Sequence, residues 1–468
     1  MRLTFKELKD QIAKIVPKDV PYTVELEAGN IAIVTPVPAK FGGGDGLIGK
    51  IAKRVKRKIV LRPDESIMKS EEEATKLIRE IVPESAEISN IYFDSCYREI
   101  IIQCQNPGEA VGRRGANLNA IRDQTGWLVK VERISPIVSK TVHDIRGYRQ
   151  VNAKERRKLL KDFGLNIHRP QRPGSAWARV TALGSYREVG RACHFVTTNE
   201  SRVMIDVGVN IASDTDPMPY FTAPEALPLE KLDAVVLTHA HLDHAGMLPV
   251  LFKYGYRGPV YCTPPTRDLM LLLQTDYLKV GGSEGKRAPY DMEDIRTCMK
   301  HVVDVDWGDT TDIAPDIKLT FSNAGHILGS SAVHLHIGDG KHNIVFSGDQ
   351  KYEKSWLFDA ANTRFPRVET LVIESTYGAS GDYQPSRQEA NQELQDIVSR
   401  TISRGGKLIC PVFAVGRSQE VMIAIDELFR SGQVKPVPVW LDGMIQEATA
   451  IHASHPDYLT NSLRKSLL

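Results

Sequence analysis

One short segment of the chain concentrates side chains that bind metal ions. It reads LDAVVLTHAHLDHAG, and an apolar stretch over residues 234–237 runs directly into the polar part. Its ligand-type residues are His239, His241, Asp243 and His244. Three imidazoles and a carboxylate on a loop after a strand can direct two sets of donor atoms toward neighbouring metals. A turn of surface histidines is the alternative, but the H-x-H-x-D-H order favours a metal site.

This segment strongly resembles the metallo-β-lactamase superfamily. The resemblance extends to Asp206 at the end of VMID, to His326 in AGHILGS and to Asp349 in VFSGD. It implies one zinc bound by His239, His241 and His326, a second bound by Asp243 and His244, and Asp349 bridging both. Asp206 is then expected to support the ligand loop without binding metal itself.

The resemblance also implies a reaction. Two adjacent zinc ions lower the pKa of a shared water, so that hydroxide forms at neutral pH, and they offset the charge of a phosphodiester under attack. Because histidine binds metal only as the neutral imidazole, activity is expected to fall in acid.

The residues after Asp349 resemble the β-CASP nucleases of that superfamily. A strand expected over residues 370–373 leads to Glu374 in ESTYG, the position of the family's acidic motif A. A second strand is expected over residues 407–411, and PVFAVGRSQEVMIAIDELF then fits the inserted β-CASP domain, although residues 417–429 also fit an ordinary amphipathic helix. The expected catalytic residues are Asp206, Asp243, His244, Asp349 and Glu374.

Two further histidines of that family have no counterpart in a matching context. After Asp349 the chain offers His452 and His455, in ATAIHASHPDY, which resembles an internal helix that ends before Pro456. We expect both imidazoles at the surface or in packing. The resemblance therefore implies a C-terminally truncated chain, with the second zinc one protein ligand short and no general acid.

The N-terminal third contains a repeat that could position RNA. Ile15-Val16-Pro17 recurs as Ile81-Val82-Pro83, and Gly46-Leu-Ile-Gly49 recurs as Gly112-Arg-Arg-Gly115, both 66 residues apart. Each copy predicts a helix, two strands, a glycine-bounded tetrapeptide, a helix and a strand. That order resembles the prokaryotic type II KH domain.

The two copies differ in the tetrapeptide that a KH domain uses to approach RNA. In the second copy, two glycines permit a close approach and two arginines supply charge for phosphates, so the expected RNA contacts are Gly112, Arg113, Arg114 and Gly115. In the first copy the interior is Leu47-Ile48, which is apolar. There the basic helix predicts a different contact, through Lys53, Arg54 and Arg57.

Length and charge agree with several domains of different kinds. The 468 residues suggest about three units. Residues 1–172 carry 32 basic and 22 acidic side chains, whereas the rest carries 28 and 36. A basic end favours nucleic acid, although a solvated helix face explains a charge run equally well. The sequence has no long apolar run, a polar N-terminus and six dispersed cysteines, so we expect a cytoplasmic protein with no membrane contact.

Together these features predict an α+β and α/β multidomain protein. The expected parts are a first KH-like domain (1–69), a second KH domain (70–137), a basic connector (138–178), a metallo-β-lactamase αββα sandwich (179–383) and an incomplete β-CASP domain (384–468). The whole chain resembles archaeal KH-containing cleavage and polyadenylation specificity factor homologues, which are ribonucleases linked to transcription termination.

The resemblance implies a zinc-dependent endonuclease for single-stranded RNA, with 5′-to-3′ exonuclease activity as an addition. It also implies RNA polymerase or the termination machinery as a partner, and a homodimer for a full-length form. Two alternatives stay open: a catalytically inactive RNA-binding termination scaffold, and a hydrolase of small esters. The KH repeat and Glu374 count against the second alternative.

Overall fold

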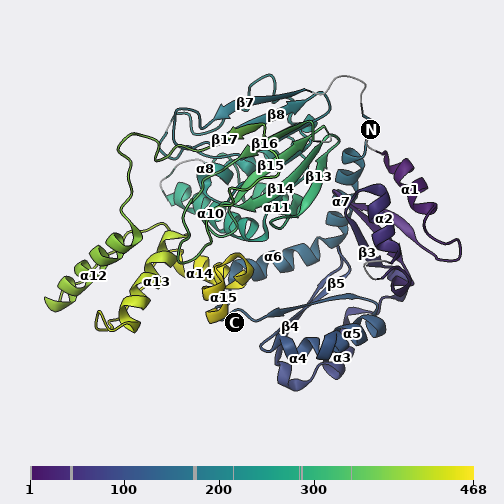
Figure 1. The fold of residues 1–468 in the computed structure, drawn as a ribbon, viewed down its shortest axis with the longest axis horizontal. Coiled ribbons are helices and arrows are strands. Elements are labelled where there is room, and N and C mark those ends of the chain that lie inside the picture. Colours follow the sequence, from purple (N-terminus) through teal and green to yellow (C-terminus); the bar gives the residue numbers. More distant parts are fainter. Residues whose placement is uncertain are drawn as a thin grey trace.

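The computed structural model describes residues 3–42, 46–171, 177–213, 215–283, 285, 288–338 and 340–467. Two small α/β units at the N-terminal end precede a large body of two stacked sheets, and a group of helices follows (Figure 1). Within the described residues, no helix is both long and apolar enough to cross a membrane. Residues 172–176 of the expected connector lie outside the described part of the chain.

The two N-terminal units repeat one topology, as the 66-residue period predicts. In each, the first two strands are antiparallel and the third is parallel to the second. The first unit contains α1 (Phe5–Ala13), β1 (Thr23–Glu27), β2 (Asn30–Thr35), α2 (Leu47–Val55) and β3 (Ile59–Pro63). The second contains α3 (Glu71–Ile81), β4 (Ile88–Asp94), β5 (Glu99–Cys104), α4 (Pro107–Val111), α5 (Ala116–Thr125) and β6 (Leu128–Arg133).

Local sequence explains where the first helix of each unit begins. Thr4 and Glu7 form a reciprocal capping box at α1, and Ser70 and Glu73 form the same arrangement at α3. Each pair supplies hydrogen bonds to backbone N–H groups that lack an intrahelical partner.

Two connecting helices, α6 (Lys140–Val151) and α7 (Ala153–Ile167), lie between these units and the two-sheet body (Figure 1). The first unit docks through the turn between β1 and β2. A Cβ added at Gly29 would lie 2.3 Å from the backbone oxygen of Asp312, so only glycine fits there. Arg57 Nε lies 3.0 Å from Asp312 Oδ2, and both side chains are largely buried.

The body consists of two sheets packed face to face. One has the strand order β12-β11-β10-β9-β8-β7 and the other β13-β14-β15-β16-β17. The first sheet contains β7 (Ala178–Gly184), β8 (Cys193–Thr198), β9 (Arg202–Ile205), β10 (Ala234–Val236), β11 (Val260–Cys262) and β12 (Val302–Asp304). The second contains β13 (Thr310–Ala314), β14 (Ile317–Asn323), β15 (Ser331–Ile337), β16 (His342–Phe346) and β17 (Thr370–Val372).

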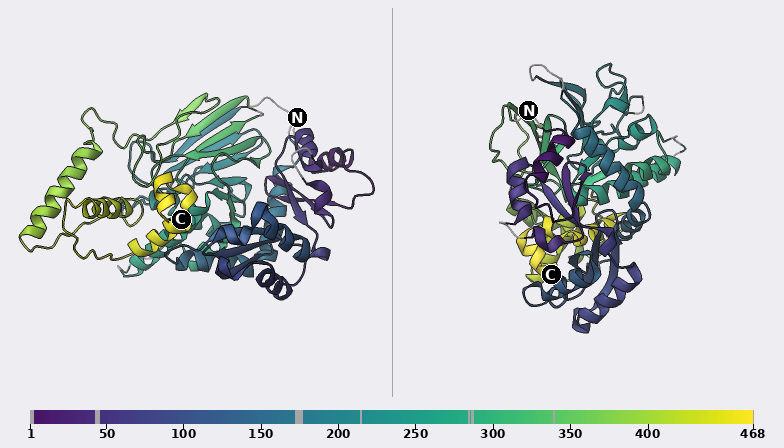
Figure 2. Two further views of the ribbon diagram at one scale, coloured as in Figure 1. Left: turned by 60° about the horizontal axis from the view of Figure 1, so that its bottom comes forward. Right: turned by 90° about the vertical axis from the view of Figure 1, so that its right-hand side faces the viewer.

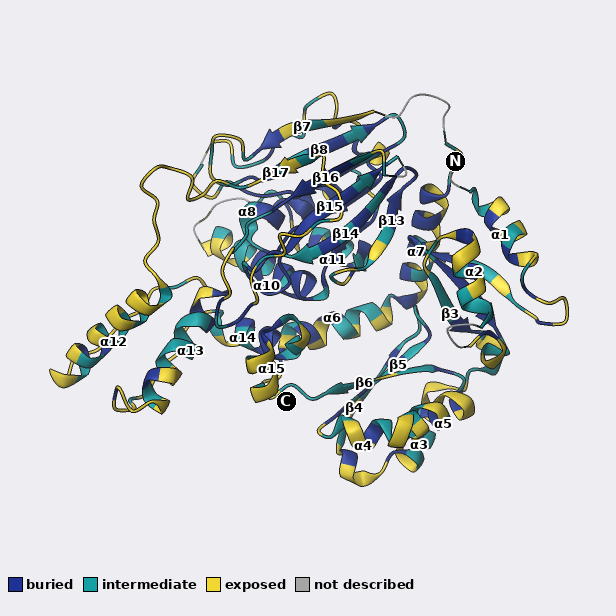
Figure 3. Ribbon diagram, in the orientation of Figure 1, coloured by how far each residue is buried: buried dark blue, intermediate teal, exposed yellow. Residues whose placement is uncertain are grey.

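Alternation along the strands divides the apolar core into two layers. Val203 and Ile205 of β9 face the second sheet, whereas Met204 faces the helices on the outer side. These helices are α8 (Leu242–Ala245), α9 (Leu248–Lys253), α10 (Pro264–Ser283) and α11 (Met292–His301). Figure 3 shows the stacked strands as the most continuously buried part of the molecule.

The C-terminal helices are less buried. They are α12 (Arg387–Ser403), α13 (Arg417–Arg430), α14 (Ile445–Ser454) and α15 (Asn461–Leu467). Figure 2 shows α12 and the first unit at opposite ends of the molecule. The strand expected over residues 407–411 is wrong, because this segment has no strand partner in the described chain. Without a partner its apolar side chains stay in solvent, and Ile409 is 86% exposed.

Candidate metal centre

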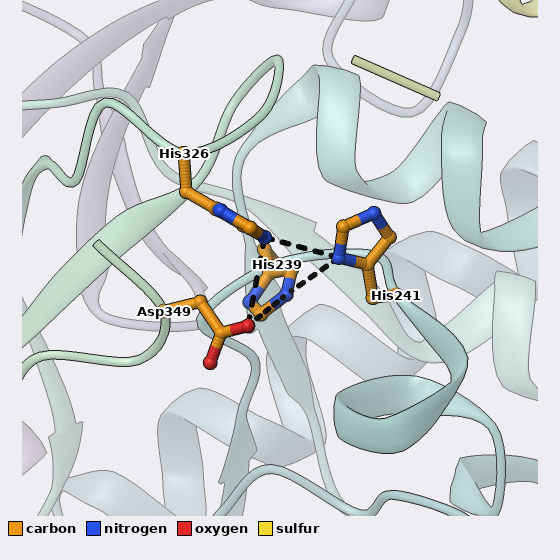
Figure 4. A group of neighbouring side chains, drawn as sticks. All are labelled: His239, His241, His326 and Asp349. Carbon is orange, nitrogen blue, oxygen red and sulfur yellow. Dashed lines mark hydrogen bonds and ion pairs between the residues drawn. The ribbon is translucent and has the colours of Figure 1, made fainter. Parts of the chain in front are cut away.

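The predicted metal ligands lie on loops after several strand ends that meet at one edge of the sandwich. The loop between β10 and α8 carries His239 and His241, the loop between β14 and β15 carries His326, and Asp349 follows β16. Figure 4 shows these four side chains pointing toward one another. The loops join buried strands, so the sheet register determines their relative positions.

Three imidazole nitrogens converge in the first group. His241 Nδ1 lies 3.2 Å from His239 Nε2 and 3.1 Å from His326 Nε2. Asp349 Oδ2 lies 3.5 Å from His326 Nε2 and 4.0 Å from His239 Nε2. One ligand atom from each of these four residues lies within 4.8 Å of the others, a spacing that suits a single metal ion.

A second group adjoins the first. His239, Asp243 and His244 also offer ligand atoms within 4.8 Å of one another. His244 Nε2 lies 3.8 Å from Asp243 Oδ2 and 3.1 Å from Asp349 Oδ1. The two oxygens of Asp349 therefore face different groups, the arrangement that a carboxylate bridging two cations requires.

Asp206 orients the second group without belonging to either. This buried carboxylate accepts hydrogen bonds from Thr238 N at 2.7 Å and Thr238 Oγ1 at 2.8 Å. His244 Nδ1 lies 2.7 Å from Asp206 Oδ2. When Nδ1 donates its proton to Asp206, Nε2 is left with a lone pair aimed at the metal position. The backbone of Asp206 is left-handed, with φ of 60°, which directs its side chain under the loop.

Two glycines allow the loops to approach this closely. A Cβ at Gly208 would lie 1.6 Å from the backbone oxygen of Asp243, and that oxygen accepts a hydrogen bond from Ala192 N at 2.8 Å. A Cβ at Gly348 would lie 2.7 Å from Thr238 Cβ, and the φ of Gly348 is +55°. Larger residues at either position would separate the ligand-bearing loops.

The electrostatics of the cluster fit a bound cation. Burial, reinforced by the neighbouring imidazoles, lowers the pKa of His239 well below its usual value, and burial and His241 lower the pKa of His326 to about 3. Both rings are therefore neutral, as metal ligation requires. Burial alone would lower the pKa of His244, but the Asp206 and Asp349 carboxylates raise it well above its usual value. The position between His244 and Asp349 thus attracts positive charge, whether a proton or a metal ion.

Glu374, a predicted catalytic residue, lies outside both groups, and so do His452 and His455, expected at the surface or in packing. The Glu374 carboxylate accepts hydrogen bonds from Gln350 N at 3.4 Å and Thr376 N at 2.9 Å, which places it beside the Asp349 loop. His452 is buried, and its Nδ1 lies 2.7 Å from Ala448 O. His455 Nε2 lies 2.8 Å from Asp268 Oδ2, on α10.

The GxxG loop of the second unit presents its arginines to solvent. Gly112 and Gly115 have φ of +73° and +77°, and Arg114 is also left-handed at 54°. Arg113 and Arg114 are exposed at the start of α5. Asn117 Nδ2 donates to Glu109 O at 3.0 Å and closes the loop from behind. This loop has the open backbone and the free charge that phosphate contact needs.

The basic helix of the first unit departs in part from the prediction. Lys53 and Arg54 are exposed on α2, and Arg54 Nε donates to Gln11 Oε1 at 2.9 Å. Arg57, expected to contact RNA, instead forms the largely buried ion pair with Asp312 of β13. A guanidinium that has left solvent for a carboxylate on another domain is not available to a phosphate, so this assignment is corrected.

The sequence reading passed over two residues near the centre. The Thr238 hydroxyl lies between Asp206 and His239 Nδ1, the latter at 3.0 Å, and its position directly before the first ligand was the available signal. Arg417 was treated as part of a helix. Its charge reinforces the lowering of the His326 pKa, for which burial is the main cause, so Arg417 lies within electrostatic range of the metal groups.

The fold and the two metal groups define a class: a metal-dependent hydrolase domain of the metallo-β-lactamase type, preceded by KH units. The metallo-beta-lactamase superfamily matches residues 186–401. The family described as "Transcription termination factor FttA, KH domain" matches residues 2–68. The first match confirms the metallo-β-lactamase resemblance, and the second confirms a KH domain at the N-terminal end.

Comparison of nearly the whole chain with known proteins narrows this class to one family. The chain is 51% identical over 460 residues to Transcription termination factor FttA of Methanosarcina mazei, covering 98% of the chain and 72% of the relative. It is 48% identical to the protein of that name from Methanothermobacter thermautotrophicus, covering 99% and 73%, and 46% identical to that from Thermococcus kodakarensis, covering 99% and 72%. The chain belongs to the Transcription termination factor FttA family.

Proposed function

We propose that the chain is a two-zinc ribonuclease that cleaves phosphodiester bonds of single-stranded RNA in 3′-end processing and transcription termination. The observation that carries the proposal is Asp349, whose two carboxylate oxygens face the two metal groups separately. The printed name of the relatives supports the role in termination. Donor sets of imidazole and carboxylate support zinc over magnesium or calcium, which favour oxygen ligands alone.

Different residues of the chain would have different roles in this reaction. Two bound cations would supply hydroxide at neutral pH and offset the charge of the phosphate. His239, His241 and His326 would hold one position, and His239, Asp243 and His244 lie around the other. Asp206 would keep His244 in the tautomer that offers Nε2. Glu374 would support Asp349 through the backbone of Gln350.

The KH units would deliver the substrate. Arg113 and Arg114 are exposed on a loop that suits a sugar-phosphate backbone, and unpaired RNA is the substrate that such loops accommodate. By family resemblance we extend the proposal to contacts with RNA polymerase or the termination machinery, and to a homodimer. Endonucleolytic cutting is the main activity proposed, with 5′-to-3′ exonuclease activity as an addition.

The test is cleavage of labelled single-stranded RNA by the zinc-loaded protein. His241→Ala and Asp243→Ala should abolish cleavage and leave RNA binding intact, because the KH loop lies on a separate unit. His342→Ala is the matched control, since this imidazole bonds Thr370 Oγ1 at 3.0 Å and belongs to neither metal group. Unchanged cleavage in the two ligand variants would refute the proposal. RNA binding without cleavage by the wild-type protein would favour the termination scaffold.

A further inference from the structure

A groove lies where α13 begins, next to the metal centre. It has a volume of about 480 Å³ and is lined by Pro411, Val412, Phe413, Arg417 and Val421. Gly416, the residue before α13, packs against the loop that carries His326: a Cβ added there would lie 2.9 Å from Ile327 Cγ2. The groove therefore adjoins a metal ligand loop, although none of its lining residues belongs to either metal group.

Hydrogen bonds hold the wall of this groove in place. Ser418 N donates to Phe413 O at 3.2 Å, and Gly416 N donates to Gln419 Oε1 at 2.8 Å. Gln419 Nε2 reaches Ala414 O at 3.1 Å and Thr449 Oγ1 of α14 at 3.0 Å. The turn from Phe413 to Arg417 is thus anchored although the side chains of these two residues are exposed, so little ordering entropy would oppose ligand binding.

Positive charge is available on one side of the groove. Arg417 is exposed, and it has no ion pair among the residues that the structure describes. It occupies the first position of α13, where unpaired N–H groups and the helix dipole add to the field felt by an anion.

An exposed aromatic ring also lines the groove. Phe413 is 79% exposed, and no ring contact within the described residues covers it. Keeping an apolar ring in water costs free energy unless a ligand covers it. A flat ring and an unpaired guanidinium four residues apart match the two parts of a nucleotide, since bases stack on aromatic rings and phosphates pair with arginine.

We propose that Phe413 and Arg417 form a nucleotide subsite beside the metal centre, in which Phe413 stacks on a base of single-stranded RNA and Arg417 contacts a phosphate of the same strand. The inference rests on the proposed ribonuclease function. It extends that function by naming a place beside the metal groups where the RNA strand is held. Because every base has a flat face, the subsite grips RNA without reading its sequence.

The first test compares short RNA oligomers by fluorescence anisotropy in EDTA, which prevents cleavage. The protein with Phe413 and the Phe413→Leu variant are compared. Both carry Arg113→Ala and Arg114→Ala, so that RNA binding by the KH loop does not mask binding in the groove. Phe413→Leu should weaken binding roughly five- to hundredfold, the range for one lost stacking contact. Phe413→Trp should restore the affinity. With an oligomer that carries one abasic nucleotide at the stacked position, Phe413→Leu should have no effect.

The matched control is Trp440→Leu, which removes an aromatic ring that is 90% exposed but does not line the groove. In the Arg113→Ala, Arg114→Ala background, equal affinity for the intact oligomer with and without Phe413→Leu would overturn the proposal. Equal losses with intact and abasic oligomers would exclude base stacking and also overturn it. If the groove binds a protein instead of RNA, Phe413→Leu should leave the affinity for the intact oligomer unchanged.

The second test measures the salt dependence of the same binding. Arg417→Ala should lower the slope of log affinity against log salt by about 0.7, the contribution of one phosphate contact on a single strand. Arg430→Ala, at the other end of α13 and paired with Asp426 at 2.7 Å, should leave the slope unchanged. An unaltered slope in Arg417→Ala would exclude the phosphate contact.

These experiments separate the two proposals. RNA held through the groove but not cleaved by the zinc-loaded protein would reject the ribonuclease and keep the subsite. Cleavage with an unchanged KM in Phe413→Leu and Arg417→Ala would keep the ribonuclease and reject the subsite. If both are right, both substitutions should raise KM more than they lower kcat, because neither residue is a metal ligand.

Discussion

Asp206 shows how a residue that binds no metal can determine a metal site. It is almost fully buried, and it holds both Thr238, directly before the first ligand, and His244, a member of the second group. Its left-handed backbone makes this double contact possible. Removing its charge would leave the ligand residues present but no longer correctly oriented.

We therefore expect Asp206→Asn to weaken zinc binding roughly 10- to 100-fold, the usual effect of losing a partner behind a metal ligand. Competition with a chromophoric chelator would measure the affinity. Asp233→Asn is the control, because Asp233 is a similarly buried carboxylate just before β10 that pairs with Arg169 at 2.7 Å instead of a ligand. Equal zinc affinities in the wild-type and Asp206→Asn proteins would contradict the role assigned here.

A sequence pattern can place residues whose partners are near in the chain. The spacing of His239, His241, Asp243 and His244 predicts them as ligands, and the structure brings their side chains together. Arg57 could not be assigned correctly, because its partner Asp312 lies in another domain and only the folded chain brings the two together. The groove of Phe413 and Arg417 was missed for a related reason: its place depends on the packing of Gly416 against Ile327.

At the level of secondary structure, a buried charge network joins the C-terminal helices to the two-sheet body. Asp268 of α10 pairs with Arg267 at 2.6 Å and with His455, just after α14, at 2.8 Å. Burial would raise the pKa of Asp268, but Arg267 and His455 outweigh it and lower that pKa to about 2. The carboxylate is thus charged in the folded protein across the physiological range.

This shift predicts a pH dependence of stability. Because the folded pKa lies below the usual value of 3.8, the carboxylate stabilises the fold above about pH 4, and this contribution is lost as the pH falls toward 2. It amounts to about 2 kcal/mol. Asp268→Asn should unfold more easily at pH 7 and lose less stability between pH 5 and pH 2.5. Urea unfolding at each pH would measure this, with Asp276→Asn of α10 as control; parallel curves for wild type and Asp268→Asn would contradict it.

The elements themselves were predictable to different degrees. The helix predicted at the start of the second copy is present as α3, and the Ser70–Glu73 capping box that begins it is a local signal. The strand over residues 407–411 failed because a strand forms only with a partner, and apolar composition does not reveal whether one is available. The segment is also not helical in the structure.

On the scale of the molecule, the KH-like units and the candidate metal groups lie on separate bodies joined by α6 and α7. Arg149 of α6 pairs with Asp304 of β12 at 2.6 Å, and Arg267 of α10 pairs with the same carboxylate at 2.7 Å. The connecting helix α6, which follows the second unit, is therefore attached to the two-sheet body through a shared, partly buried carboxylate. Substitutions on the GxxG loop should affect RNA affinity without disturbing the metal centre.

Replacing Arg113 and Arg114 by alanine should weaken RNA binding and lower the salt slope by about 1.4, because each lost phosphate contact on a single strand removes about 0.7. Zinc content should not change. Filter binding across a salt series would measure the slope. Lys76→Ala with Arg79→Ala, two exposed cations on α3 of the same unit, is the matched control. A slope that drops equally in both double variants would show general charge attraction instead of a contact by the loop.

The docking of the first unit on Asp312 also concerns the order in which the chain is made. Gly29 and Arg57 leave the ribosome long before Asp312, and at typical elongation rates the interval is roughly 10 to 50 s. During that time the first unit can fold, but its docking turn faces solvent and its arginine lacks its carboxylate. The nascent protein thus passes through a stage in which a basic KH unit is free while the metal centre does not yet exist.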